Sequence, residues 1–205
     1  MEYEPQPGLR PPGMAHSIYA ALVVPRPIGW ITTLSSDGVV NLAPYSFFNG
    51  VAAEPMSVMY CANGPHTEGG PKDSLQNVTE TGQFVFNLVT ADLADAMNKT
   101  SADAPRSVDE MALAGLEPQP SMKVAPPRVG ASPIHLECEL DQIVELPSNE
   151  TMLNRMVIGR VVHIHIADEV IVDGMVDWKR LRPLARLGYM DYAEIAEPFT
   201  MNRPG

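Results

Sequence analysis

Five segments of the chain are rich in β-branched and aromatic residues and have the length of β-strands. They span residues 28–34, 56–61, 84–89, 134–140 and 156–166. Apolar and polar residues alternate along 134–140, which is typical of a strand with one face in water. A Ser-Ser-Asp-Gly turn signal follows the first segment, so this segment is expected to turn back into a hairpin.

The helical segments between these strands are few and short. One follows Asp73, the expected N-cap, and ends at Gly82, and a second covers residues 91–97. A third is predicted from a capping box, with Ser107 as N-cap and Glu110 as the third helical residue. A parallel α/β sheet would need helices that alternate regularly with strands. The pattern instead favours a mainly β fold, a closed or partly closed antiparallel β-barrel with short peripheral helices.

The chain divides into an N-terminal arm and one domain. Residues 1–15 are rich in proline and polar residues, cannot form a regular element and are expected to be extended. The remaining residues, 16–205, have the length of a single domain. Within it, residues 114–133 carry five prolines and predict an extended excursion that is suited to a partner interface.

Charge and composition exclude several classes of function. The formal net charge of −11 disfavours binding to nucleic acid or to an anionic membrane, since both require clustered positive charge. No apolar run approaches the ~20 residues of a membrane span, and the N-terminus lacks the pattern of a signal peptide. Cys61 and Cys138 lie in apolar, strand-like segments and are interpreted as buried thiols without a catalytic or disulfide role. We therefore expect a cytoplasmic protein.

Lys72 is the candidate anion ligand. It is the only Lys or Arg between Arg26 and Lys99, and it stands at the predicted start of a helix. The free N–H groups of a helix N-terminus, together with a lysine and the hydroxyl of Ser74, form a phosphate site. The alternative is that Lys72 is an ordinary solvated surface residue.

The segment 41–48 combines hydrogen-bonding groups with aromatic side chains, and Pro44 keeps it extended. The polar members are Asn41, Tyr45 and Ser46, and the aromatic pair is Phe47 and Phe48. These two kinds of surface suit a flat heteroaromatic ligand with a phosphate tail. In the alternative interpretation the two phenylalanines belong to the core and Ser46 caps a turn.

The histidines allow several interpretations. His163 and His165 are two positions apart on a predicted strand, so they share a face and have a spacing that can chelate a metal. No Cys, Asp or Glu partner is apparent nearby in sequence, and no metal site is predicted. The alternatives are packing of this strand face against a second subunit, or contact of one histidine with a flavin or nicotinamide. His66 lies in a Gly- and Pro-containing loop and is expected to be exposed.

Several blocks, taken together and in order, closely resemble the flavin reductase-like family. They are residues 25–33, 41–48, 72–74, 82–89, 97–101, 108–110, 114–116, 136–138 and 184–188. The resemblance covers roughly residues 16–192 and implies an FMN-binding split β-barrel. In this family FMN lies at a homodimer interface, so the resemblance also implies a homodimer.

The resemblance implies a set of cofactor-binding residues. The isoalloxazine ring would be lined by Thr32, Thr33 and Leu34, with backbone N–H groups reaching its polar edge. The dimethylbenzene edge, ribityl chain and phosphate would be followed by Asn41, Ala43, Pro44, Tyr45, Ser46, Phe47 and Phe48, with Ser46 on the phosphate. The phosphate site would be closed by Lys72, Asp73 and Ser74. Contacts from either subunit would come from Asn98, Lys99, Arg186 and Tyr189.

Two positions depart from the family pattern. Ser74 stands where the family often has threonine, which keeps the hydroxyl. Tyr189 stands where many relatives place a second glycine, so the geometry of that C-terminal contact is expected to differ.

The function implied is that of an NAD(P)H:flavin oxidoreductase. Hydride would pass from NADH or NADPH to FMN, and electrons would pass on to free flavin or another small acceptor, with a monooxygenase as a partner that receives reduced flavin. This scheme needs no catalytic acid or base, because the cofactor carries the chemistry. One alternative is a non-catalytic flavin- or haem-binding split-barrel protein. A second is a structural or interaction module without a ligand.

Overall fold

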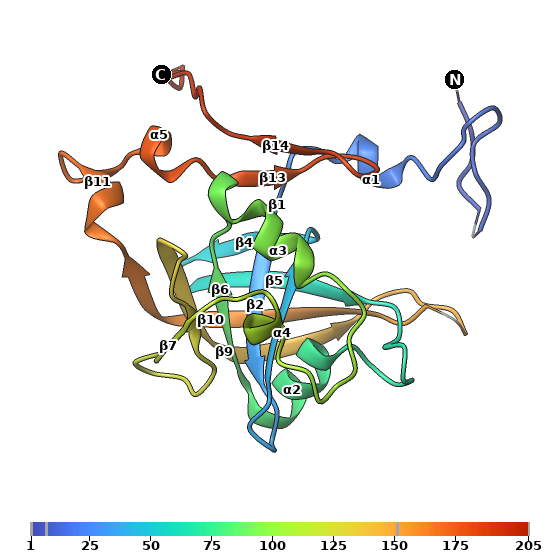
Figure 1. Ribbon diagram of the computed structural model, residues 1–205. Helices are drawn as coiled ribbons and strands as arrows, with labels where there is room; N and C mark the ends of the chain where they lie inside the picture. Colours follow the sequence, from blue (N-terminus) through green and yellow to red (C-terminus); the bar gives the residue numbers. More distant parts are fainter. Residues whose placement is uncertain (1, 7, 151, 205) are drawn as a thin grey trace.

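The computed structural model describes residues 2–6, 8–150 and 152–204. Its main feature is a seven-stranded sheet in the order β3-β2-β6-β9-β10-β5-β4, with every neighbouring pair antiparallel (Figure 1). The strands are β2 (Gly29–Leu34), β3 (Val40–Tyr45), β4 (Phe48–Ala53), β5 (Met56–Asn63), β6 (Gln83–Asn87), β9 (Ile134–Glu145) and β10 (Asn154–Ile166). The five predicted strands and the hairpin after residue 34 are confirmed, and so is the mainly β class.

The two edges of this sheet meet. Strands β3 and β4 stand at opposite ends of the strand order, yet only Ser46 and Phe47 separate them along the chain. The sheet must therefore curl until its edges are adjacent, and the backbone N–H of Cys61 on β5 donates to the Phe47 carbonyl at 2.9 Å. We call this closure, formed by Ser46 and Phe47, the seam.

The interior of the curled sheet is filled with aromatic and aliphatic side chains. Tyr60 and Phe84 are fully buried and meet edge to face, with ring centroids 5.4 Å apart. Phe48 is buried and stacks on Phe86 at 4.6 Å. Gly159 on β10 leaves space for the ring of Phe84 on β6, since an added Cβ at Gly159 would lie 2.3 Å from a ring carbon of Phe84. Phe48 is thus a core residue, as the alternative interpretation of segment 41–48 held.

Short helices lie outside the sheet: α2 (Asp73–Thr81), η1 (Ala91–Leu93), α3 (Ala94–Lys99) and α4 (Glu110–Leu113). Helix α2 ends at Gly82 in the left-handed conformation, as predicted, but its N-cap is Lys72 and not Asp73. Similarly, α4 is capped by Asp109, whose carboxylate accepts the N–H of Ala112 at 3.0 Å, and not by Ser107. In both cases the observed N-cap lies one or two residues from the predicted one.

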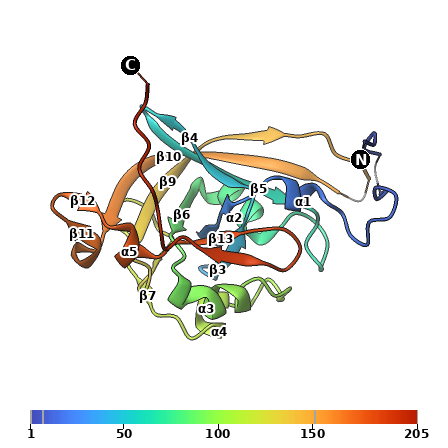
Figure 2. The same cartoon turned by 90° about the horizontal axis from the view of Figure 1, so that it is seen from above.

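A small three-stranded sheet covers one end of the barrel beside α3 (Figures 1 and 2). It contains β1 (Arg26–Pro27), β13 (Leu184–Arg186) and β14 (Tyr192–Glu194). Arg26 is buried and donates to the carbonyls of Val23 at 2.7 Å and Leu187 at 2.9 Å, which ties α1 (Tyr19–Leu22) to this sheet. An added Cβ at Gly188 would lie 2.4 Å from Cβ of Ala21, so α1 packs directly on this backbone.

The remaining segments are extended or form small ribbons. Residues 2–6 and 8–15 contain no helix or strand and reach away from the barrel (Figure 2). The predicted excursion holds the short ribbon of β7 (Pro118–Gln119) and β8 (Arg128–Val129). The other elements are η2 (Asp168–Val170), β11 (Ile171–Val172), β12 (Met175–Val176) and α5 (Trp178–Leu181). Within the described residues, every helix is too short or too polar to cross a membrane.

Candidate functional site

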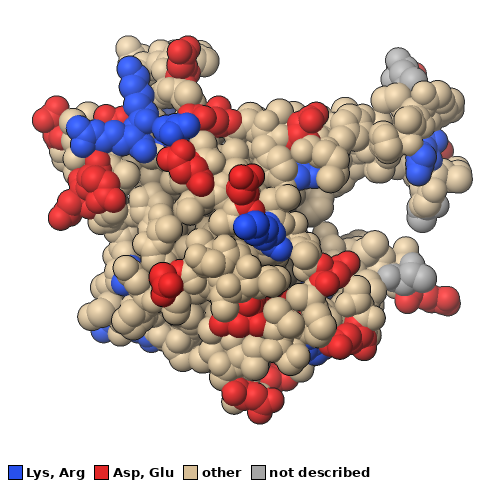
Figure 3. Space-filling model, viewed as in Figure 1, with Lys and Arg blue, Asp and Glu red and all other residues tan. Residues whose placement is uncertain are grey.

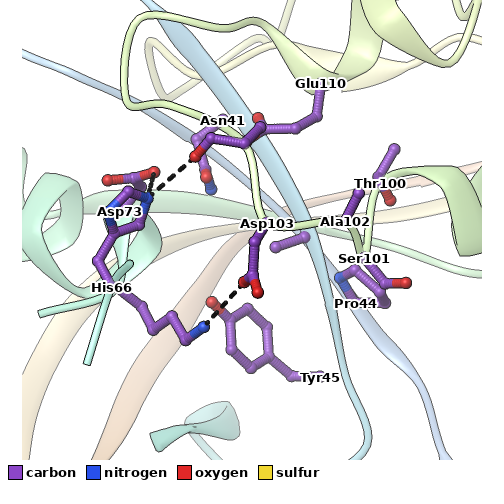
Figure 4. Close-up of a pocket in the computed structure, with 13 residues that line it drawn as sticks. Asn41, Pro44, Tyr45, His66, Asp73, Thr100, Ser101, Ala102, Asp103 and Glu110 are labelled. Carbon is purple, nitrogen blue, oxygen red and sulfur yellow. Dashed lines mark hydrogen bonds and ion pairs between the residues drawn. The ribbon is translucent and has the colours of Figure 1, made fainter. Parts of the chain in front are cut away.

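Two adjoining pockets lie beside the seam. The first has a volume of about 180 Å³ and is framed by β3, the start of α2 and the loop after α3 (Figure 4). The second has a volume of about 360 Å³ and is framed by the small sheet, α3 and Ser46 of the seam. Pro44 and Ser101 line both pockets. The two pockets are therefore neighbours, one bearing a lysine and the larger one with aromatic and cationic walls.

The sequence predicted much of this lining. The first pocket brings together Asn41, Ala43, Pro44, Tyr45, Lys72 and Asp73. The second brings together Pro44, Ser46, Asn98, Arg186 and Tyr189. These residues come from positions far apart in the chain, and the closure of the barrel together with the small sheet places them around one site.

Lys72 provides the positive charge of the first pocket. Its Nζ lies 3.7 Å from a carboxylate oxygen of Asp103, and both side chains are partly exposed. Asp73 is held by an ion pair with Arg106, whose guanidinium also donates to the carbonyls of Gly69 and Pro71. Since Asp73 already has a cation, Asp103 is the carboxylate that neutralises Lys72. An incoming anion would have to compete with Asp103 for this lysine.

His66 is buried and forms part of the same wall, so the prediction of an exposed His66 is wrong. Its Nε2 lies 3.3 Å from Asp73, a contact dashed in Figure 4, and 3.1 Å from the carbonyl of Ala104. The glycine-rich loop around it suggested exposure because loops usually lie at the surface. Here the side chain folds back and joins the loop before α2 to the loop after α3.

Glu110 is another lining residue that sequence reasoning did not assign to the site. It is buried, and its carboxylate accepts the backbone N–H of Leu42 at 3.1 Å. Strand β3 is an edge strand, so amides on its outer side need a partner outside the sheet. Burial raises the pKa of Glu110 to about 7; the Leu42 hydrogen bond opposes this shift, and Asp73 adds to it.

Seven predicted cofactor residues do not line either pocket. These are Thr32, Thr33, Leu34, Phe47, Phe48, Ser74 and Lys99. The reasons differ from residue to residue, and a cofactor contact through the backbone of 32–34 stays a prediction.

The hydroxyls of Thr32 and Thr33 are already used inside the protein. Both residues are fully buried, and Asn87 donates to Thr32 at 2.8 Å. Thr33 accepts from Asn77 at 3.0 Å and from Asn41 at 3.3 Å. These bonds link β2 to its neighbours and to α2, so the threonine side chains hold the strand in place.

Ser74 and the aromatic pair are also engaged elsewhere. Ser74 is fully buried, and its hydroxyl bonds to that of Tyr45, while its carbonyl accepts from Tyr60 at 3.2 Å. Burial raises the pKa of Tyr45 to about 12, so its hydroxyl stays protonated. Phe47 lies between the Tyr19 ring, at 6.0 Å, and the Arg26 guanidinium, at 5.7 Å. A contact between Ser74 and a phosphate therefore stays a prediction that needs this hydroxyl to reorient.

Arg186 and Tyr189 form the wall of the second pocket that belongs to the small sheet. The Arg186 guanidinium stacks on the ring of Tyr192 at 4.4 Å and donates to the carbonyl of Tyr189. Tyr189 has φ of 56°, the left-handed region that favours glycine. Tyr189 therefore adopts a backbone conformation that favours glycine, at the position where many relatives have a glycine. Its ring lies 5.6 Å from that of His16.

The cysteines and the surface charge show no competing chemistry. Cys138 is buried and Cys61 is half-buried, so full burial is confirmed only for Cys138, and burial raises the pKa of both thiols. On the face shown in Figure 3, the basic side chains near α5 lie among acidic ones, and Arg182 pairs with Asp92 and Glu194. This face therefore has no extended basic patch.

Comparisons with known proteins identify the family. The chain matches the model of the flavin reductase like domain over residues 21–184. An uncharacterized protein from Halalkalibacterium halodurans is 38% identical over 184 residues, which are 89% of this chain and 87% of that protein.

Solved structures agree with this match. Nitrilotriacetate monooxygenase component B from Bacillus cereus has a TM-score of 0.83 and 30% identity, covering 97% of this chain and 100% of that one. A split-barrel protein from Shewanella frigidimarina has a TM-score of 0.78 at 21% identity, covering 90% of this chain and 89% of that one, and shows the same fold. The predicted split barrel is thus confirmed, and the chain belongs to the flavin reductase-like family.

Proposed function

We propose that the protein is an FMN-dependent oxidoreductase that takes hydride from NADH or NADPH. The observation that carries this proposal is the joining of a lysine-bearing pocket to a larger pocket with aromatic and cationic walls, across Pro44. This arrangement fits a flat ring system with an anionic tail. Its donor set includes an ammonium group, two guanidinium groups and amide side chains, which suit phosphate and carbonyl oxygens.

Each part of the site has a separate task in this proposal. Lys72 and the free N–H groups at the start of α2 would hold the phosphate. Arg186 lines the second pocket and would stabilise negative charge on a reduced ring. When bound, FMN supplies the hydride chemistry itself, so the side chains need only bind, orient and stabilise. A separate catalytic acid or base is not required.

The electron acceptor and the assembly form part of the same proposal. The similarity to a monooxygenase component B supports free reduced flavin as the product and a monooxygenase as its consumer. We further propose a homodimer in which the exposed Tyr189 and Met190, at the rim of the second pocket, face the partner subunit. The two free cysteines are consistent with the expected cytoplasmic location.

An absorbance spectrum of the purified protein, followed by anaerobic addition of NADH or NADPH, tests the function. We expect a flavin spectrum, either as purified or after FMN is added, that bleaches with one of the two nicotinamides. A flavin spectrum that persists with both donors would refute the reductase and favour a flavin carrier, and a haem spectrum would refute the cofactor. Protein that fails to take up FMN would refute the site. Light scattering of the eluted protein measures the oligomeric state.

A further inference from the structure

A cluster of histidines and one glutamate lies on strands β9 and β10, apart from both pockets of the flavin site. In the antiparallel register, His163 lies opposite Glu137, and His165 lies opposite His135. Side chains two positions apart on a strand share a face, so all four side chains meet on one face of this ribbon. The rings of His163 and His165 are 4.5 Å apart, and those of His135 and His165 are 5.9 Å apart.

Glu137 is unusual because it is fully buried. One carboxylate oxygen accepts the N–H of Met122 at 2.8 Å and lies 2.5 Å from Nε2 of His165. The other accepts the N–H of Lys123 at 2.6 Å. Among the described residues, no Lys or Arg forms an ion pair with Glu137. A buried carboxylate needs a compensating positive charge. For Glu137 this charge has to come from the side of the carboxylate on which His163 and His165 lie.

The geometry of the cluster suits a cation. One ligand atom from each of Glu137, His163 and His165 lies within 4.8 Å of the others. Two imidazole nitrogens and one carboxylate oxygen form a set that binds zinc and related divalent ions. Carboxylates that bind a metal are usually held by further hydrogen bonds, as Met122 and Lys123 hold Glu137.

A third histidine, His135, lies beside this set. His135 is buried, its Nε2 lies 2.9 Å from the carbonyl of Val129, and its Nδ1 has no hydrogen-bond partner. His135 and His165 both line a cavity of about 340 Å³, and Arg128 is another of its lining residues. This cavity is large enough for water molecules that complete the coordination of an ion.

We propose that Glu137, His163 and His165 bind a divalent transition-metal ion of the zinc class, with water from the adjoining cavity at the open positions. The ion would replace the direct contact between Glu137 and His165 and would neutralise the buried carboxylate. Glu137 also holds the backbone of Met122 and Lys123. The metal would therefore fasten the proline-rich excursion to the barrel, a structural role separate from the flavin chemistry.

Metal titration of the full-length chain, purified without a histidine tag and treated with a chelator, tests the proposal. We expect Zn²⁺ to bind at one equivalent by calorimetry, and Co²⁺ to give visible absorption bands that Zn²⁺ removes. His163→Ala leaves the contact between Glu137 and His165 in place and should weaken Zn²⁺ binding at least tenfold. His16→Ala removes a histidine outside the cluster and should leave the affinity unchanged.

Two outcomes would overturn the proposal. One is the absence of saturable Zn²⁺ binding to the wild-type protein. The other is equal Zn²⁺ affinity of the wild type and of His163→Ala, which would place the ion elsewhere. If His163→Ala fails to fold, His163→Gln serves as the second variant, with circular dichroism to confirm its fold. FMN uptake is measured separately, so failure of the metal site and failure of the flavin site are distinguishable.

Discussion

Replacement of Asp103 by asparagine should tighten FMN binding, although the residue lines the pocket that is proposed to hold the phosphate. Lys72 lies 3.7 Å from Asp103, whose side chain is 68% exposed. The Asp103 carboxylate pairs with the lysine that the phosphate needs, and its negative charge also repels the phosphate. Asp103→Asn removes both effects and keeps nearly the same size and shape.

The magnitude follows from the exposure of this pair. An exposed ion pair contributes about 0.2–1 kcal/mol, which the phosphate has to overcome. Unit charges about 4 Å apart in water interact by about 1 kcal/mol, which is the scale of the repulsion removed. Together these terms predict a gain of about 1–2 kcal/mol, or roughly five- to thirtyfold in affinity.

Titration of FMN and of riboflavin, followed by flavin fluorescence, separates the phosphate from the ring. Asp103→Asn should tighten FMN and leave riboflavin unchanged, because riboflavin carries no phosphate. Lys72→Ala should weaken FMN by about 1–3 kcal/mol and also spare riboflavin. In the Lys72→Ala background, Asp103→Asn should tighten FMN binding less than it does in the wild type, because the lysine that Asp103 neutralises is absent. Weaker FMN binding by Asp103→Asn, or equal tightening of both flavins, would refute the reasoning.

Three further predictions concern stability. Burial raises the pKa of Glu110 to about 7, so the folded protein favours the protonated carboxyl. The stabilising effect of this group is therefore present below pH ~4.5 and is lost as the pH rises through 7. Glu110→Gln should remove this dependence and raise the free energy of unfolding at pH 8 by at most about 3 kcal/mol in urea titrations; an unchanged pH profile would contradict this. Tyr189→Ala should have a lower melting temperature than Tyr189→Gly, because only glycine relieves the strain of the left-handed backbone at φ 56°. The reverse order of melting temperatures would contradict this. Gly159→Ala should lower the urea midpoint by an amount equivalent to about 1–3 kcal/mol, because the added Cβ would clash with Phe84. The control Gly38→Ala places its Cβ within 4 Å of no other atom, so it tests backbone strain alone. Equal losses of stability in the two variants would contradict the packing argument.

The sequence was sufficient for the strands and for the grouping of Asn41, Tyr45 and Lys72 around one pocket. Alternation and turn residues act over short distances, so β2, β3 and β9 could be recognised without knowledge of the fold. Helix starts were less certain, because Asp73 and Ser107 both have side chains suited to a cap. In the structure the Asp73 carboxylate pairs with Arg106 and His66, and the Asp109 carboxylate caps α4.

Contacts between distant segments could not be predicted in this way. The burial of His66 depends on the loop after α3, which supplies the Ala104 carbonyl. The partner of His163 is Glu137, 26 positions earlier, and only the register of β9 against β10 brings them together. The side chains of Thr32 and Thr33 point into networks with Asn87 and Asn77 because β2 is a central strand, which a single sequence does not reveal.

The seam at Ser46 and Phe47 has a consequence for the order of assembly. Three of the six strand pairs described in the seven-stranded sheet join segments far apart in the chain, namely β2 with β6, β6 with β9 and β5 with β10, and such pairings form slowly. Strands β3 and β4 are joined through Ser46 and Phe47 from the start, so the ring of strands closes only when these distant pairings are complete. The wall that carries Pro44 and Ser46 therefore does not exist in a partly folded chain. A ligand in this site would bind the closed barrel alone, so its concentration would set how much of the protein is folded.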